Sequence, residues 1–174
     1  MLSLLTITIP SIPDYGRIGA NARHRTWRSR WLSEVAERNK WIEQLVALGY
    51  RSREQPLLSG DLAVDVTLWF TTKRYPDQTD NLISGLKHLF DVLEVSRIVN
   101  RNMTVRGFAG IYENDKQLRL LNAPTIIVDR NVAPITQVAF YARRLNGTQG
   151  GKSLHCTAIN TQSVVSYRKQ GNDG

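Results

Sequence analysis

The chain has 174 residues, 41% of them hydrophobic and 22% charged, with a formal net charge of +8 at pH 7. This length suits about one domain with a buried core, and the absence of any run of about 18 apolar residues argues against a membrane span. One cysteine cannot form an internal disulfide, and one cysteine with three histidines disfavours a thiolate–imidazole zinc site, so a bound metal would be a hard cation on carboxylates.

The positive charge points to a polyanionic partner. Lysine and arginine side chains that neutralise phosphates release condensed counterions and so gain affinity. In the alternative, the positive charge only keeps the protein soluble. The basic residues cluster, however, which favours a nucleic-acid partner. The lone Cys156 suits a reducing cytoplasm.

The first half of the chain predicts a strand, a loop and a helix. Leu5, Ile7 and Ile9 alternate with threonines, which predicts a strand that ends at Pro10, and the start MLSLLTITIPSIP lacks the charged region of a signal peptide. Residues 14–26 are rich in Gly, Asn and Arg and predict a loop. From Trp27 to about Leu48 the apolar residues recur at helical spacing, and Gly49 is a plausible stop.

The second half predicts a second helix among strands. Residues 62–72 alternate as a strand, 80–94 have the apolar spacing of a helix, and further strands are expected around 107–112, 117–128 and 135–142. This order predicts an α+β domain over 1–146, with a mixed sheet and two helices on one face. Residues 147–174 form a polar extension, for which disorder and short strands both stay open.

Three segments carry candidate chemistry, and each has an ordinary structural explanation. Asp80 opens the second helix, where an aspartate either caps the backbone or faces a cation. Lys87 and Asp91 are spaced i,i+4, which suits an ion pair, and His88 is expected to face solvent. Asp115 follows Gly110 and Glu113-Asn114, where acids commonly lie in a solvated turn.

Taken together, these segments resemble the RusA family of Holliday-junction resolvases. The family pattern is Asp-x-Asp-Asn-Leu opening a helix, then Lys-x-x-x-Asp-x-Leu, then an apolar-Gly stretch into Asp-Asp and Gln. It is matched by Gln78 to Leu82, by Lys87 to Leu93 and by Asn114 to Gln117, and the resemblance spans about residues 4–142.

The resemblance implies a RusA-like fold, a homodimer and cleavage of four-way DNA junctions with Mg²⁺ or Mn²⁺. It assigns metal binding and catalysis to Asp80 and Asp115, and places Lys87 near the scissile phosphate. The first acid of the family pattern is Gln78 here, and Asn114 replaces another. We expect Asp77 to stand in for the missing carboxylate and to share an ion with Asp80 and Asp115.

Five arginines within fourteen residues, with no acid between them, predict a phosphate-binding surface. They are Arg17, Arg23, Arg25, Arg28 and Arg30. Gln78 and Asn114 keep two alternatives open: an inert or weakly active junction-binding protein of the same fold, and a nuclease for other branched DNA. The expected location is cytoplasmic, at the nucleoid, and a phage or prophage origin is suggested by association only.

Overall fold

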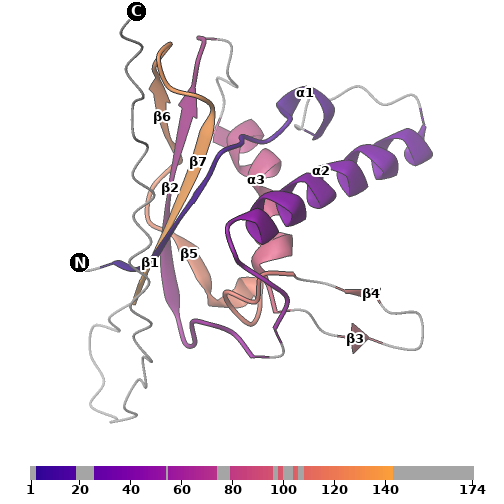
Figure 1. Cartoon of the computed structure of the whole chain (residues 1–174), viewed down its shortest axis with the longest axis vertical. Coiled ribbons are helices and arrows are strands. Elements are labelled where there is room, and N and C mark those ends of the chain that lie inside the picture. The colour runs from indigo at the N-terminus through magenta and orange to yellow at the C-terminus, as the bar shows by residue number, and fades with distance from the viewer. Residues whose placement is uncertain are drawn as a thin grey trace, which may run out of the picture.

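The computed structural model shows an α+β fold built on one mixed sheet (Figure 1). It describes residues 3–18, 26–53, 55–73, 79–95, 98–99, 104–105 and 108–142, with 79–80, 98–99 and 104–105 described through the backbone alone. The predicted fold class and mixed sheet are confirmed. The extension at 147–174 lies outside the described residues. Within the described ranges, no helix is long and apolar enough to cross a membrane.

The sheet is centred on β2 (Leu62–Phe70). On one side β2 pairs antiparallel with β7 (Ile135–Ala142), which pairs antiparallel with β1 (Ser3–Ile9). On the other side it pairs in parallel with β5 (Leu118–Leu120) along its first residues and with β6 (Thr125–Val128) along its last. The segment predicted as one strand at 117–128 is therefore two strands that follow the same edge of β2.

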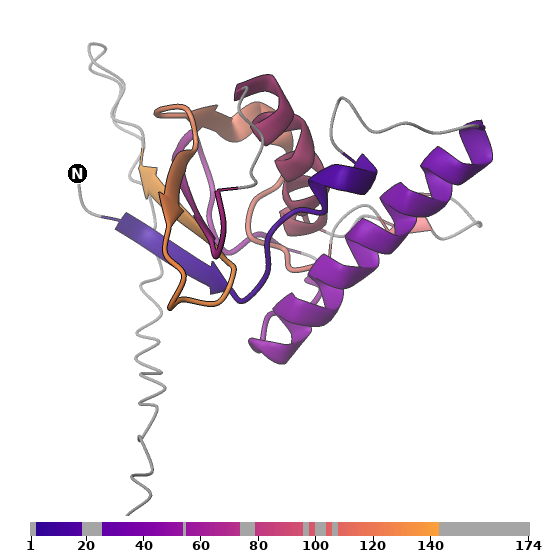
Figure 2. The ribbon, with the colours of Figure 1, turned by 90° about the horizontal axis from the view of Figure 1, so that it is seen from above.

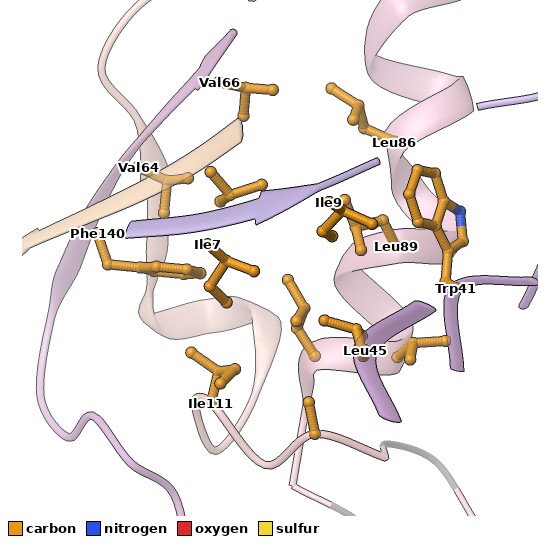
Figure 3. Close-up of a cluster of buried hydrophobic side chains, with 14 of the residues drawn as sticks. Ile7, Ile9, Trp41, Leu45, Val64, Val66, Leu86, Leu89, Ile111 and Phe140 are labelled. Carbon is orange, nitrogen blue, oxygen red and sulfur yellow. The ribbon is translucent and has the colours of Figure 1, made fainter. Parts of the chain in front are cut away.

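Both long helices, α2 (Trp27–Ala47) and α3 (Thr79–Leu93), lie on one face of the sheet, as predicted (Figures 1 and 2). The core fills the space between sheet and helices (Figure 3). Its fully buried side chains include Ile7, Ile9, Trp41, Leu45, Leu68, Leu86, Leu89 and Phe140. The alternating pattern of β2 explains this arrangement, because every second residue from Leu62 to Phe70 faces the helices and is buried.

The ends of α2 follow from its sequence. Thr26 is the N-cap, and its hydroxyl accepts a hydrogen bond from the Ser29 N–H in a capping box. At the other end Gly49 has φ +87°, its N–H donates to Val46, and the Tyr50 N–H donates to Leu45. These two bonds form a Schellman motif, which confirms Gly49 as the predicted stop.

A partly buried ion pair fastens the segment after β1 to α2. Glu37 is 4% exposed, and its Oε1 lies 2.7 Å from the Lys40 Nζ and 3.3 Å from the Asp14 backbone N. The Lys40 ammonium also donates to the carbonyl of Ile12 over 2.7 Å. A short helix, α1 (Tyr15–Ile18), follows within the segment predicted as a loop. Burial, and then the charge of Glu37, raises the pKa of the Tyr15 hydroxyl.

The expected strand at 107–112 is wrong for the residues that the structure describes there. Phe108, Ala109, Ile111 and Tyr112 are apolar and partly or fully buried, but their N–H groups donate to the carbonyls of Val92 and Leu93 at the end of α3. The segment therefore satisfies the carbonyls that a helix end leaves without partners. Two short strands that were not predicted, β3 (Ile98–Val99) and β4 (Thr104–Val105), pair antiparallel before it.

Candidate functional site

Asp80 is the second residue of α3, which begins just beyond the end of β2. Its side chain is not among those described, and Asp77 and Gln78 lie wholly outside the described residues. The two residues that follow Asp80 are described with their side chains: Asn81 is 8% exposed and Leu82 belongs to the core. The predicted helix opening is therefore confirmed, and the backbone of Asp80 is placed at the sheet edge where β2 ends.

Lys87 lies exposed in the middle of α3. Although Lys87 and Asp91 are both described residues, no ion pair within 4.0 Å joins them, so the expected i,i+4 pair is absent. The ammonium of Lys87 is thus available to an anionic ligand. The adjacent His88 corrects a second expectation, because it is buried, at 7% exposed, rather than facing solvent.

Asp115 opens a single turn of 3₁₀ helix, η1 (Asp115–Gln117), at the edge where β2 begins. Asn114 caps this turn, and its Oδ1 accepts a hydrogen bond from the Lys116 N–H over 3.0 Å. Gln117 accepts from the Glu113 N–H over 2.7 Å and donates to the carbonyl of Gly60 over 3.2 Å. Asn114 and Gln117 therefore shape the turn, and Asp115 is left exposed on it.

Glu94, just after α3, ties Asp115 to that end of the helix. Its Oε1 accepts a hydrogen bond from the Asp115 N–H over 2.9 Å. Nearby, the buried Tyr112 donates its hydroxyl to the carbonyl of Phe90. Burial, and after it the negative charges of Glu94, Asp91 and Asp115, raises the pKa of the Tyr112 hydroxyl. Three carboxylates thus lie around this end of α3, and Glu94 is the one that the sequence analysis missed.

Asp80 and Asp115 lie at opposite ends of α3. Fourteen residues separate Asp80 from Glu94, and at 1.5 Å per residue this is about 20 Å along the helix axis. The parallel pairing of β2 with β5 explains the separation, because α3 returns the chain to the edge where β2 begins. We had expected Asp80 and Asp115 of one chain to bind the same ion. Their separation along α3 is too large for that within a single chain. Among the side chains that the structure describes, no three Asp, Glu, His or Cys residues form a metal-binding group.

A further acid lies at the Asp80 end of the sheet. Asp129 directly follows β6, and its N–H donates to the carbonyl of Phe70, the last residue of β2, over 2.9 Å. Its Oδ1 accepts a hydrogen bond from the Asn131 N–H over 2.9 Å. In the sequence, Asp129 is recognisable only as an acid immediately after the segment Thr125–Val128. The parallel pairing of β6 with β2 places this acid beside the end of β2.

The arginine-rich segment is only partly described, because Arg23 and Arg25 lie outside the described residues. Arg17 forms an ion pair with Asp14 at 3.4 Å, and Arg30 forms one with Glu34 at 3.0 Å. Both arginine side chains remain about 70% exposed, at 71% and 70%. Arg28 is exposed without an ion pair in the described part of the chain. These arginines are therefore accessible, although acids just outside the segment reduce its net charge.

No known protein-family model matches the sequence, and no curated protein matches it with significance.

Proposed function

We propose that this protein is a divalent-cation-dependent endodeoxyribonuclease that acts as a homodimer on four-way (Holliday) DNA junctions. The observation that carries the proposal is the arrangement of the RusA-like segments around one helix. Asp80 opens α3, Lys87 lies exposed along it, and the turn with Asp115 is fastened to its far end by Glu94. A net charge of +8 and accessible arginines suit a DNA substrate.

The distance between Asp80 and Asp115 leads us to propose a site shared by two subunits. In a twofold-symmetric dimer, the Asp80 end of α3 in one subunit would face the Asp115 end in the other, and the symmetry would repeat the site. Two equivalent sites are what symmetric cleavage of two strands requires. Carboxylates brought together in this way repel one another unless a cation lies between them, which favours a Mg²⁺ or Mn²⁺ requirement.

In this proposal the basic side chains have separate roles. Lys87, which has no ion pair with any residue that the structure describes, would place positive charge near the phosphate that is cut, where negative charge develops during hydrolysis. Arg17, Arg28 and Arg30, with Arg23 and Arg25, would bind phosphates other than the one that is cut and so position the junction. Asp77 remains our candidate for the carboxylate that Gln78 does not supply.

The main alternative is a junction-binding protein with little or no catalytic activity. Asn114 favours it, because this residue caps η1 and brings no charge to the Asp115 end. A nuclease for other branched DNA is a second alternative, since the same surface would serve flaps. All three functions use the basic surface, so only cleavage and substrate choice separate them.

A nicking assay on a synthetic four-way junction tests the proposal. We expect cleavage with Mg²⁺ or Mn²⁺, none with EDTA, and less on a flap or a linear duplex of the same sequence. Asp80→Asn and Asp115→Asn should each abolish cleavage and leave junction binding intact, because each removes negative charge rather than a phosphate contact. Glu43→Gln, an exposed acid on α2, is the matched control and should cut normally. Binding without cleavage under every cation would favour the inert alternative.

A further inference from the structure

The apolar stripe of α2 continues beyond the part of the helix that the core covers. Trp41 and Leu45 are fully buried among the core side chains that include Leu86 and Leu89 of α3 (Figure 3). Trp27 and Trp31 lie on the same side of the helix by its 3.6-residue repeat, yet they are 76% and 50% exposed. Figures 1 and 2 show the reason: the N-terminal part of α2 projects past α3.

The two exposed indoles form one aromatic surface. Their ring centroids are 6.4 Å apart and the ring planes are inclined by 33°. Adjacent exposed indoles are typical of binding surfaces, because covering them removes a large apolar area from water. We call Trp27 and Trp31 the indole pair.

The charge beside the indole pair favours nucleic acid over a second copy of the chain. Arg28 and Arg30 flank the stripe on its two sides by helix geometry. Glu34 forms an ion pair with Arg30 at 3.0 Å, so Arg28 carries the net positive charge beside the indole pair. In a twofold contact between two such surfaces, Arg28 of each copy would face a surface that also carries net positive charge. A phosphate next to the indoles would instead neutralise Arg28, which has no ion pair among the described residues.

We propose that the indole pair is a stacking platform for unpaired bases at a DNA branch point, with Arg28 and Arg30 on the adjoining phosphates. This inference rests on the proposed function and adds the feature of branched DNA that the protein recognises. Bases in a continuous duplex are stacked on one another and present no free face, whereas bases beside a branch can unstack. The platform therefore selects the branch rather than the sequence.

Equilibrium binding in EDTA tests the inference without any cleavage. The probes are a four-way junction, a 20-nucleotide single strand and a linear duplex, each followed by fluorescence anisotropy. W27A/W31A should weaken binding to the junction and the single strand by about tenfold or more, and binding to the duplex far less. W27F/W31F keeps aromatic faces and should retain most of the affinity, whereas W27L/W31L keeps only apolar area and should behave as the alanine variant.

Intrinsic fluorescence provides a second readout. The single strand should quench the emission of the wild-type protein, and W27F/W31F should lose this quenching. Of the two tryptophans that remain, Trp41 is buried in the core, and Trp69 lies on β2 on the face of the sheet that is turned away from the helices. Equal losses on junction and duplex, or full affinity in W27L/W31L, would overturn the inference. Dissociation of a dimer in W27A/W31A would also overturn it, because the indole pair would then lie between two copies of the chain.

These outcomes are separable from those of the proposed function. A protein that never nicks DNA but binds unpaired bases through the indole pair keeps this inference and loses the proposed function. A protein that nicks junctions, and whose affinity is unchanged in W27A/W31A, keeps the proposed function and loses this inference.

Discussion

His88 illustrates how a single residue can depart from its sequence pattern. Its position next to Lys87 on an amphipathic helix predicted a solvent-facing side chain, but the imidazole packs inward. Its Nδ1 is buried and has no hydrogen-bond partner within the described part of the chain. Burial lowers the pKa of His88, and the nearby Arg38 lowers it further. The pattern failed here because α2 lies against this side of α3, which the periodicity of α3 alone does not reveal.

This lowered pKa predicts a pH-dependent stability. Since the folded-state pKa of His88 is below the unfolded value of about 6.5, the unfolded chain binds the extra proton first, and stability falls as the pH drops below about 6.5. We expect the urea midpoint of the wild-type protein to fall more between pH 7 and pH 5 than that of His88→Leu, which cannot take up this proton. Equal falls in both proteins would show that His88 does not contribute.

The candidate site also shows what residue types alone can establish. Asp80 and Asp115 were singled out by their spacing within a pattern, and the structure places both at the ends of one helix. Glu94 and Asp129 were missed, because each is an ordinary acid until its neighbours are known: the Asp115 N–H for Glu94 and the carbonyl of Phe70 for Asp129.

At the scale of elements, the segments with a strong hydrophobic repeat were predicted correctly, whereas a short buried segment without such a repeat was not. The spans of α2, α3 and β2 agree with the expected ones within about two residues, because each has a long repeat and a clear end signal. A strand was expected around 107–112, a short segment that has no long repeat. Its apolar side chains do fill the core, but its N–H groups cap α3, and a short apolar run does not reveal that choice.

The close approach of Tyr15 to α3 predicts a coupling between two elements. A Cβ on Gly85 would lie 2.1 Å from the Tyr15 Cε1, so Gly85→Ala should displace the ring and destabilise the protein by about 1–2 kcal/mol. In a Tyr15→Ala background the same change should stabilise by about 1 kcal/mol, because alanine is the better helix former. Urea unfolding of the double-mutant cycle measures this. The same effect in both backgrounds would show that the two positions are independent.

At the scale of the whole molecule, the sequence predicted the fold class but not the relation between the acids. The order of elements favoured an α+β domain with a mixed sheet, which the structure has. The pattern did not reveal that β5 and β6 run parallel to β2. Because of that pairing, α3 runs from the end of β2 back to the level at which β2 begins, and so separates Asp80 from Asp115. This separation is why we propose a site built from two subunits.

The basic surface makes a prediction about salt. Replacing Arg23 and Arg25, which lie outside the described residues, should weaken junction binding and flatten its salt dependence. Each lost phosphate contact lowers the slope of log K against log salt by ~0.9. Arg119→Ala, an exposed arginine on β5, is the matched control and should leave the slope unchanged. An unchanged slope in Arg23→Ala plus Arg25→Ala would remove this segment from the DNA-binding surface.

The most direct test of the central claim, a cation-dependent junction nuclease with sites shared by two subunits, is cleavage by mixed dimers. Asp80→Asn and Asp115→Asn chains are purified separately, mixed under conditions of subunit exchange, and assayed on a four-way junction with Mg²⁺. A shared site places both substitutions in one site of the mixed dimer and leaves the other site intact, so two inactive proteins should regain cleavage of one strand. Wild-type chains mixed with each variant verify that subunits exchange. If exchange is verified and the mixture stays inactive, the two aspartates do not act across the dimer, and the account is contradicted.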